Sequence, residues 1–290
     1  HYDMMYQQEA FGIDHFDWVR RDYNNQAIEA SKIDLKPLAH SSAGTVRHYP
    51  KGAFVLQMLK YVVSREQFNA VIKYYLEKHA YGNVNSNDLL VAFHERLGLS
   101  LNWFWEEWIY KGGEPKYQVS FSEKGTQAMF EVKQVHEQND LVGLFKMPIN
   151  FEVHYTDGTQ DMKQVWIEKE SQTINFDLVA GKKISYVLFD PNSEIMKAVE
   201  FEKPTEMLKA QASFAKHMID RYDAIEALAY REFDGKEAFL MERYESESFH
   251  GIKASIIAQI LPLLNENSTV LTKKALKHAD VNVRKAALNN

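Results

Sequence analysis

Apolar residues in the first 112 positions recur with the three-to-four-residue spacing of amphipathic helices. Ser64 lies where it can cap one of these helices, and a run of capping residues from Asn85 to Asp88 precedes another. Gly98 and the glycines before Pro115 supply stop signals. The pattern therefore predicts a helical lobe, with helices over residues 52–63, 67–79, 85–97 and 100–111.

After Pro115 the apolar period changes from the helical value to two. Apolar and polar residues alternate in about seven short segments, the number typical of a small sandwich of two sheets. Residues 156–159 read Thr-Asp-Gly-Thr, which is a hairpin signal between two of these segments. We expect a small antiparallel β-sandwich over residues 115–203.

From Pro204 onward the period is helical again, in short alanine-rich stretches. The stretch from Asp220 to Leu228 resembles the one from Asp280 to Leu288, and a weaker copy lies at residues 252–257. A spacing near 30 residues is typical of helical repeats of the HEAT or armadillo type. We therefore predict three regions and a multidomain α+β fold, with boundaries at 1–114, 115–203 and 204–290. Because the chain stops just after a repeat helix, the repeat domain is expected to be truncated.

The composition excludes several classes of function. The 290 residues carry a net charge of −6, which disfavours nucleic acid as a partner. Cysteine is absent, so disulfides, thiolate zinc sites and cysteine nucleophiles are excluded. The longest apolar runs fall well short of the ~20 residues of a membrane span, and the first 30 residues show no signal-peptide pattern. Since the first residue is His1, we expect the chain to be a piece of a longer protein, and we predict no compartment.

Eleven histidines justify a search for a metal site. The helical zinc motif His-Glu-x-x-His places two imidazoles on one helix face. His94–Glu95 is followed four residues later by Gly98, and His136–Glu137 is followed by Asp140, so neither pair is completed. We interpret both as surface residues. No metal ligand set, cofactor motif or complete active site is predicted within this chain.

One segment has an unusual arrangement of residues. Residues 45–53 lead into a strongly apolar helix after a loop of small and polar residues at 40–44. Tyr49 is predicted at the junction of loop and helix, with Pro50 in the first helical turn. A phenol held there can donate a hydrogen bond to a developing negative charge. Position alone leaves open the alternative that Tyr49 only packs its ring.

The same segment resembles part of the aminopeptidase N-like zinc metallopeptidases, the gluzincins. The resemblance rests on an ordered set of motifs covering roughly 70 residues, which we compare by pattern. These motifs are Tyr49–Pro50–Lys51–Gly52–Ala53 with Leu56 and Leu59; Phe68, Tyr75, His79 and Tyr81–Gly82–Asn83; Asp88–Leu89; and Phe104, Trp108–Ile109 and Gly113–Glu114–Pro115.

The resemblance implies a fold and a role for one residue. It implies the helical lobe of a thermolysin-like catalytic domain, followed by a β-sandwich and a helical-repeat domain. In such enzymes the tyrosine that matches Tyr49 stabilises the oxyanion formed when zinc-bound water attacks the scissile carbonyl. Lys51 would act as a tether at the helix start, and Gly52 would allow close approach of another segment.

The resemblance also shows what this chain lacks. The family's His-Glu-x-x-His, its downstream glutamate ligand and its Gly-x-Met-Glu-Asn segment precede the tyrosine, so they are expected before His1. Residues 1–25 look like the helix that follows the glutamate ligand. We expect the parent to be a zinc aminopeptidase acting on peptides, with its upstream catalytic half as the partner of this chain. The chain alone is expected to hold no zinc and to be inactive.

Two alternatives stay open at this point. The protein can be a non-catalytic relative that kept the fold and lost the metal site. It can also be a helical-repeat scaffold for protein interactions, in which residues 1–112 pack as an independent bundle. The sequence upstream of His1 distinguishes the first alternative from the enzyme, because only an enzyme requires an intact zinc motif there.

Overall fold

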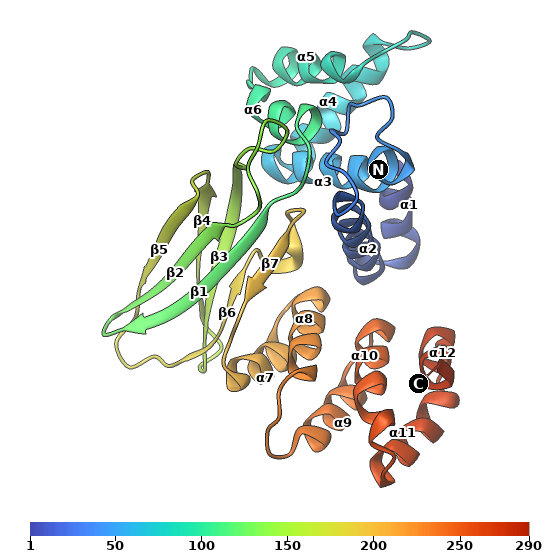
Figure 1. Ribbon diagram of the computed structural model, residues 1–290, viewed down its shortest axis with the longest axis vertical. Helices are drawn as coiled ribbons and strands as arrows, with labels where there is room; N and C mark the ends of the chain where they lie inside the picture. Colours follow the sequence, from blue (N-terminus) through green and yellow to red (C-terminus); the bar gives the residue numbers. More distant parts are fainter. Residues whose placement is uncertain (290) are drawn as a thin grey trace. The chain divides into compact units, whose positions relative to one another are not determined.

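The computed structural model describes residues 1–289, and these form a mixed α+β protein (Figure 1). The chain divides into two compact units. The first unit contains residues 1–151, 162–180 and 193–202, and the second contains 152–161, 181–192 and the residues from Lys203 onward. None of the helices in this described part of the chain has the length and apolar character needed to cross a lipid bilayer.

The first unit begins with the predicted helical lobe. Its helices and helical turns are α1 (Tyr2–Phe11), α2 (Ile13–Ser31), η1 (Arg47–Lys51), α3 (Gly52–Val63), α4 (Arg65–Lys78), α5 (Ser86–Leu97), α6 (Asn102–Trp105) and η2 (Glu106–Tyr110). The turns η1 and η2 are π-helical and continue directly into or from an α-helix. Such turns are rare and occur often at functional sites, which makes η1 of particular interest.

The capping residues predicted from the sequence act as caps. The Ser64 side chain accepts a hydrogen bond from the Gln67 amide at 3.4 Å and begins α4. At the start of α5, Asn85 and Asp88 form a reciprocal capping box. Gly98 ends the same helix in the left-handed conformation, with φ of 69°. The helix predicted over 52–63 has these bounds in the structure.

Residues 1–25 differ from the single helix that the resemblance implies. Gly12 separates α1 from α2, and its φ of 89° lies outside the helical region. Glycine adopts such a value without steric cost, so the chain changes direction there. Met4 of α1 and Phe16 of α2 still pack together with Ala53 of α3 in one apolar cluster.

Seven strands follow in the described residues, as the period-two pattern predicts: β1 (Lys116–Lys124), β2 (Gln127–Gln134), β3 (Met147–Tyr155), β4 (Gln160–Ile167), β5 (Ser171–Asp177), β6 (Ile184–Phe189) and β7 (Ala198–Phe201). One sheet has the order β5-β2-β1-β7 and the other the order β4-β3-β6. In the first sheet Phe121 of β1 is opposite Phe130 of β2. The Phe130 ring also lies 5.2 Å from that of Phe151 on β3, so aromatic side chains of the two sheets meet in a shared core.

The prediction that every strand pair is antiparallel is wrong for one pair. β7 runs parallel to β1, with Tyr117 opposite Val199. β7 reaches this edge after a connection that starts from β6 of the other sheet, through the turn Pro191–Ser193. Alternation of apolar residues reports which face is buried, but it carries no information on strand direction.

The second unit ends in six helices among the described residues: α7 (Thr205–Phe214), α8 (Met218–Ala229), α9 (Lys236–Ser246), α10 (His250–Ile260), α11 (Glu266–Leu276) and α12 (Val281–Asn289). Figure 1 shows them as short successive helices in chain order. α10 contacts α8, α9, α11 and α12. Its buried residues include Ile252, Ile256 and Ile260, together with the polar Lys253 and Ser255.

Candidate functional site

Tyr49 lies in the π-helical turn η1, on the helix that continues as α3. The backbone becomes helical at Thr45, four residues before Tyr49, and the His48 amide donates to the Gly44 carbonyl at 3.1 Å. Tyr49 therefore lies one turn further into the helix than the loop junction at which the sequence places it. Its side chain is 72% exposed, so its ring is not part of the packed interior.

Arg47 fixes the start of this helix from the buried side. Its guanidinium pairs with the Asp34 carboxylate at 2.9 Å and donates to the Ala30 carbonyl at 3.2 Å and the Ala43 carbonyl at 3.3 Å. It also donates to the Asp34 carbonyl. The pKa of the Asp34 side chain is lowered, chiefly because the Lys36 amide donates to it, with the Arg47 charge adding to the effect. One arginine thus joins the end of α2 to the loop that leads into η1.

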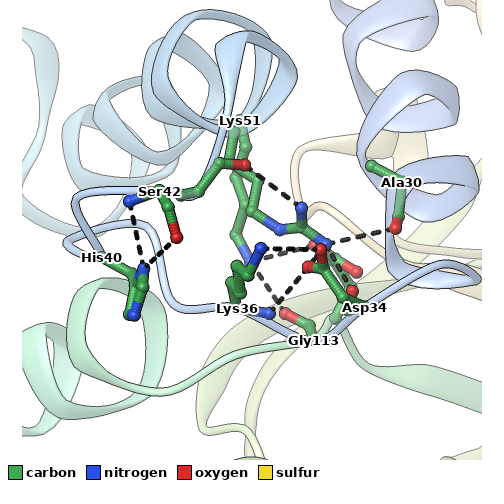
Figure 2. Close-up of polar contacts among 10 residues, drawn as sticks. Ala30, Asp34, Lys36, His40, Ser42, Lys51 and Gly113 are labelled. Atoms are coloured by element: carbon green, nitrogen blue, oxygen red, sulfur yellow. Dashed lines mark hydrogen bonds and ion pairs between the residues drawn. The ribbon is translucent and has the colours of Figure 1, made fainter.

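Lys51 fixes the other end of η1. Its ammonium group donates to the Gly113 carbonyl and to Glu114 Oε1, both at 2.9 Å, and the two side chains are 0% and 2% exposed. Figure 2 shows Lys51 reaching the Gly113 backbone, with Asp34 and Ala30 in the same cluster. Two motifs that are separate in the sequence, around positions 51 and 114, therefore meet through a buried ion pair.

The exposed side of the same segment carries small polar groups. The His40 Nδ1 accepts from the Ser42 amide at 3.1 Å and lies 3.0 Å from its hydroxyl (Figure 2). His48 Nε2 lies 3.2 Å from the His40 carbonyl, where it donates as the Nε2–H tautomer. His40, Ser42, His48 and Tyr49 are all exposed. The segment is thus anchored on its buried side by two cations and presents a phenol and two imidazoles on its exposed side.

Another segment of the chain approaches the backbone closely at Gly112, and not at Gly52 as the resemblance implies. A Cβ added to Gly52 would lie 3.6 Å from the Arg47 carbonyl oxygen, an ordinary contact distance. A Cβ added to Gly112 would lie only 1.6 Å from the Leu35 carbonyl oxygen. From the sequence, Gly112 is expected only to end a helix. The structure shows that it also lets the loop after α2 pass against the end of the helical lobe.

The two incomplete zinc motifs do not come together in the structure. His94 and Glu95 lie on the exposed face of α5, as predicted, where Glu95 bonds Lys78 at 2.5 Å. His136 is half-buried rather than a surface residue, because its ring accepts from the Lys116 amide at 3.4 Å and contacts the Gly143 carbonyl at 2.9 Å. Within residues 1–289 no three His, Asp or Glu side chains are grouped so that they could hold a metal ion. The zinc that the resemblance implies therefore does not fit the residues described here.

Sequence reasoning missed Glu114 and Asp34 as the partners of Lys51 and Arg47. The available signal for Glu114 is its position inside the Gly113–Glu114–Pro115 motif. A carboxylate at the end of an apolar helical lobe requires a partner if it is buried. For Asp34 the sequence offers no comparable signal, since it lies in a loop in which polar and apolar residues are mixed.

Comparison with known proteins finds similarity to peptidase family M1 and to several aminopeptidases. Residues 26–108 match the model of the peptidase family M1 domain. The chain is 31% identical over 149 residues to a leucyl aminopeptidase of Saccharolobus solfataricus, a match that covers 48% of this chain and 18% of that protein. It is 24% identical over 203 residues to aminopeptidase N of Haemophilus influenzae, covering 65% and 23% respectively. A third relative, the Tricorn protease-interacting factor F2 of Thermoplasma volcanium, is 40% identical over 72 residues, covering 25% and 9%.

A solved structure shares the fold. The crystal structure of Legionella pneumophila aminopeptidase A in complex with aspartic acid superposes with a TM-score of 0.70 at 16% sequence identity. The match covers 98% of this chain and 38% of that one. The chain therefore spans well under half the length of each of these proteins.

Proposed function

Because the chain belongs to the aminopeptidase N-like gluzincin family, we propose that it is the C-terminal part of a zinc-dependent aminopeptidase that releases the N-terminal residue of peptides. The observation that carries the proposal is the position of Tyr49. Its ring is 72% exposed, while Arg47 and Lys51 on either side are 4% and 0% exposed. A phenol on a firmly anchored segment is suited to meet a ligand oxygen at a defined place.

The proposed role of Tyr49 is to donate a hydrogen bond to the oxygen of the scissile carbonyl as that oxygen becomes negative. A hydroxyl donor is neutral and needs no deprotonation to do this. Because the negative charge grows toward the transition state, the bond strengthens there more than in the ground state. Loss of one such donor raises barriers by ~3–4 kcal/mol in other enzymes.

The zinc ligands of the parent are proposed to lie upstream of His1. When bound there, zinc would polarise the carbonyl and activate water. This chain would contribute Tyr49 and a wall of the peptide cavity, and its upstream half would be its partner. We propose that the chain alone is inactive, since its sequence contains no complete His-Glu-x-x-His.

We propose that residues 1–114, 115–203 and 204–290 are the helical catalytic lobe, a β-sandwich domain and a HEAT-like repeat domain. Support for the repeats comes from α8, α10 and α12, which begin at Met218, His250 and Val281, about 30 residues apart. α10 contacts both of the other two. Equivalent helices of a repeat array stack on their neighbours in this way.

The experiment compares single tyrosine variants in the longer protein that contains the upstream half. Tyr49→Phe is expected to lower kcat for a dipeptide-like chromogenic substrate by ~100- to 1000-fold while KM stays close to the original value. Tyr81→Phe is the matched control, because Tyr81 is fully exposed in a loop and loses the same hydroxyl. Its kcat is expected to be unchanged.

Equal kcat values for Tyr49→Phe and the original protein would contradict the proposed role of Tyr49. A longer protein that has no chelator-sensitive peptidase activity, or whose upstream segment lacks His-Glu-x-x-His, would contradict the enzyme and favour the scaffold. Chelator-sensitive release of N-terminal residues by the 290-residue chain alone would show that the metal site is not upstream.

A further inference from the structure

A groove of about 650 Å³ lies among the C-terminal helices of the second unit. Residues of α9, α10 and α11, and those that follow α11, form its walls. The side chains that line it include Lys253, Lys273, Lys274 and Lys277, together with a single acidic residue, Glu245. The groove therefore concentrates positive charge in a chain whose net charge is −6.

The charges in the groove are not neutralised by the one carboxylate. Glu245 pairs with Lys274 at 2.5 Å. Lys273 and Lys277 lie on the exposed surface of the groove. Lysine ammonium groups clustered around one concavity raise the local concentration of anions.

A second observation points independently to a ligand. Tyr244 also lines the groove, is 3% exposed, and its hydroxyl has no hydrogen-bond partner among the described residues. A buried hydroxyl without a partner costs free energy that a bound acceptor would recover. Burial raises the pKa of Tyr244, and Glu245 adds to the effect, so the hydroxyl stays a donor at neutral pH.

Lys253 and His278 bring further donors to the groove. The Lys253 ammonium lies 4.3 Å from the centre of the Tyr244 ring and donates to the Tyr244 carbonyl, which uses one of its three hydrogens. The Asp280 amide donates to His278 Nδ1 at 3.1 Å. The proton of the neutral ring is therefore on Nε2, which can donate.

From these features we infer that the groove between α9, α10 and α11 binds a small anion carrying phosphate groups. Four lysines and no arginine line it. Lysine ammonium groups bind phosphate as point charges, and the several oxygens of a phosphate group can be shared among several lysines. The Tyr244 hydroxyl and His278 Nε2 add two further donors, which makes a set suited to several phosphate oxygens.

The experiment titrates the full 290-residue chain with inorganic triphosphate by isothermal calorimetry at low salt. Tyr244→Phe removes only the unpaired hydroxyl and is expected to weaken binding about tenfold. The double variant Lys273→Gln/Lys277→Gln removes two exposed charges and is expected to weaken it by about tenfold or more. The matched control Lys124→Gln/Lys133→Gln makes the same change of charge at exposed positions of β1 and β2 and is expected to bind as the original chain does.

Each outcome decides the inference. Binding that weakens in both groove variants, and only there, supports it, as does loss of affinity with rising salt. Equal affinity of the double groove variant and its control would overturn it, as would the absence of any binding. Tighter binding of an oligoglutamate peptide than of triphosphate would overturn the assignment to phosphate. Thermal melting without ligand checks that the groove variants are folded, and Tyr244→Phe is expected to melt no lower than the original chain.

Discussion

Two buried polar clusters, one in each unit of the molecule, hold their charges in different ways. In the first unit Lys51 and Glu114 form a direct ion pair at 2.9 Å. In the second unit Asp220 accepts hydrogen bonds from the Asn192 amide at 3.0 Å and 3.2 Å. Lys203, close by, donates to the Val187 carbonyl at 2.9 Å and to Gln211 at 2.7 Å.

The difference between the clusters determines what each is sensitive to. A direct pair depends on both partners, since removal of either leaves the other charge buried and uncompensated. In the second cluster burial desolvates both Asp220 and Lys203 and shifts their pKa values, so its stability depends on pH. The first cluster lies under the exposed Tyr49 segment, and the second lies under no site that we identify in the described residues.

The largest expected effect is the loss of one partner of the direct pair. Glu114→Gln or Lys51→Met is expected to lower the free energy of unfolding by ~3–5 kcal/mol. The double variant Lys51→Met/Glu114→Leu removes both charges and is expected to recover most of this loss. Chemical denaturation measures the three values, and Lys78→Met, which removes the charge of an exposed ion pair, serves as the control. If the double variant is less stable than both single variants, the cluster is not dominated by burial of charge.

A smaller effect is expected at the glycine that lies between the loop after α2 and the end of the helical lobe. Gly112→Ala places a Cβ 1.6 Å from the Leu35 carbonyl oxygen, so the backbone must shift. We expect a loss of ~1–3 kcal/mol or more, as for other overpacked sites. Gly52→Ala is the matched control, because its Cβ meets nothing closer than 3.6 Å in a helix and alanine favours the helix by ~0.5–1 kcal/mol. Equal melting temperatures for the two variants would show that the loop gives way freely.

The pH dependence of the second cluster tests the other side of the comparison. Burial raises the pKa of Asp220 to about 8 and lowers the pKa of Lys203 to about 8. Unfolding returns them toward 3.8 and 10.5. Between the two Asp220 values the folded state holds more protons, so stability falls as pH rises. Between the two Lys203 values the unfolded state holds more protons, so stability rises with pH.

Together the two groups are expected to lower the Tm of the protein most near pH 8. Calorimetry across the pH range measures this minimum. Asp220→Asn is expected to flatten the acidic side of the minimum, and Lys203→Gln the alkaline side. Asp140→Asn changes an exposed carboxylate and is the control for the acidic side. A profile that is the same in Asp220→Asn and in the original chain would show that Asp220 is ionised in the folded state without cost.

Much of the fold could be predicted because it depends on residues that are close in sequence. Caps such as Ser64 and Gly98 act on their own helices, and the period of apolar residues reports each element. The parallel pairing of β7 and the contact of Lys51 with Glu114 join segments about 80 and 63 residues apart. Nothing local to either segment encodes such a partner, which is why both were missed.

The candidate site is predictable from the sequence only where it depends on residues that are close together in the chain. The motif around Tyr49 is continuous in the sequence, and the prediction of a helix there is confirmed. Its catalytic role stays a prediction until the Tyr49→Phe variant is measured. The buried anchors Asp34 and Glu114 belong to other segments, and a single sequence does not show which distant residue fills the space beside a given side chain.

The ammonium group of Lys51 has a consequence for any molecule that meets Tyr49. Since Lys51 and Arg47 are locked in place on either side, the main chain that carries the phenol is already ordered before an encounter. Only the two torsion angles of the Tyr49 side chain remain to be restricted, so little conformational entropy is lost on contact. Recognition in the role proposed for this hydroxyl would therefore be preorganised, and its strength is expected to depend on the rigidity of residue 114 as much as on the ring itself.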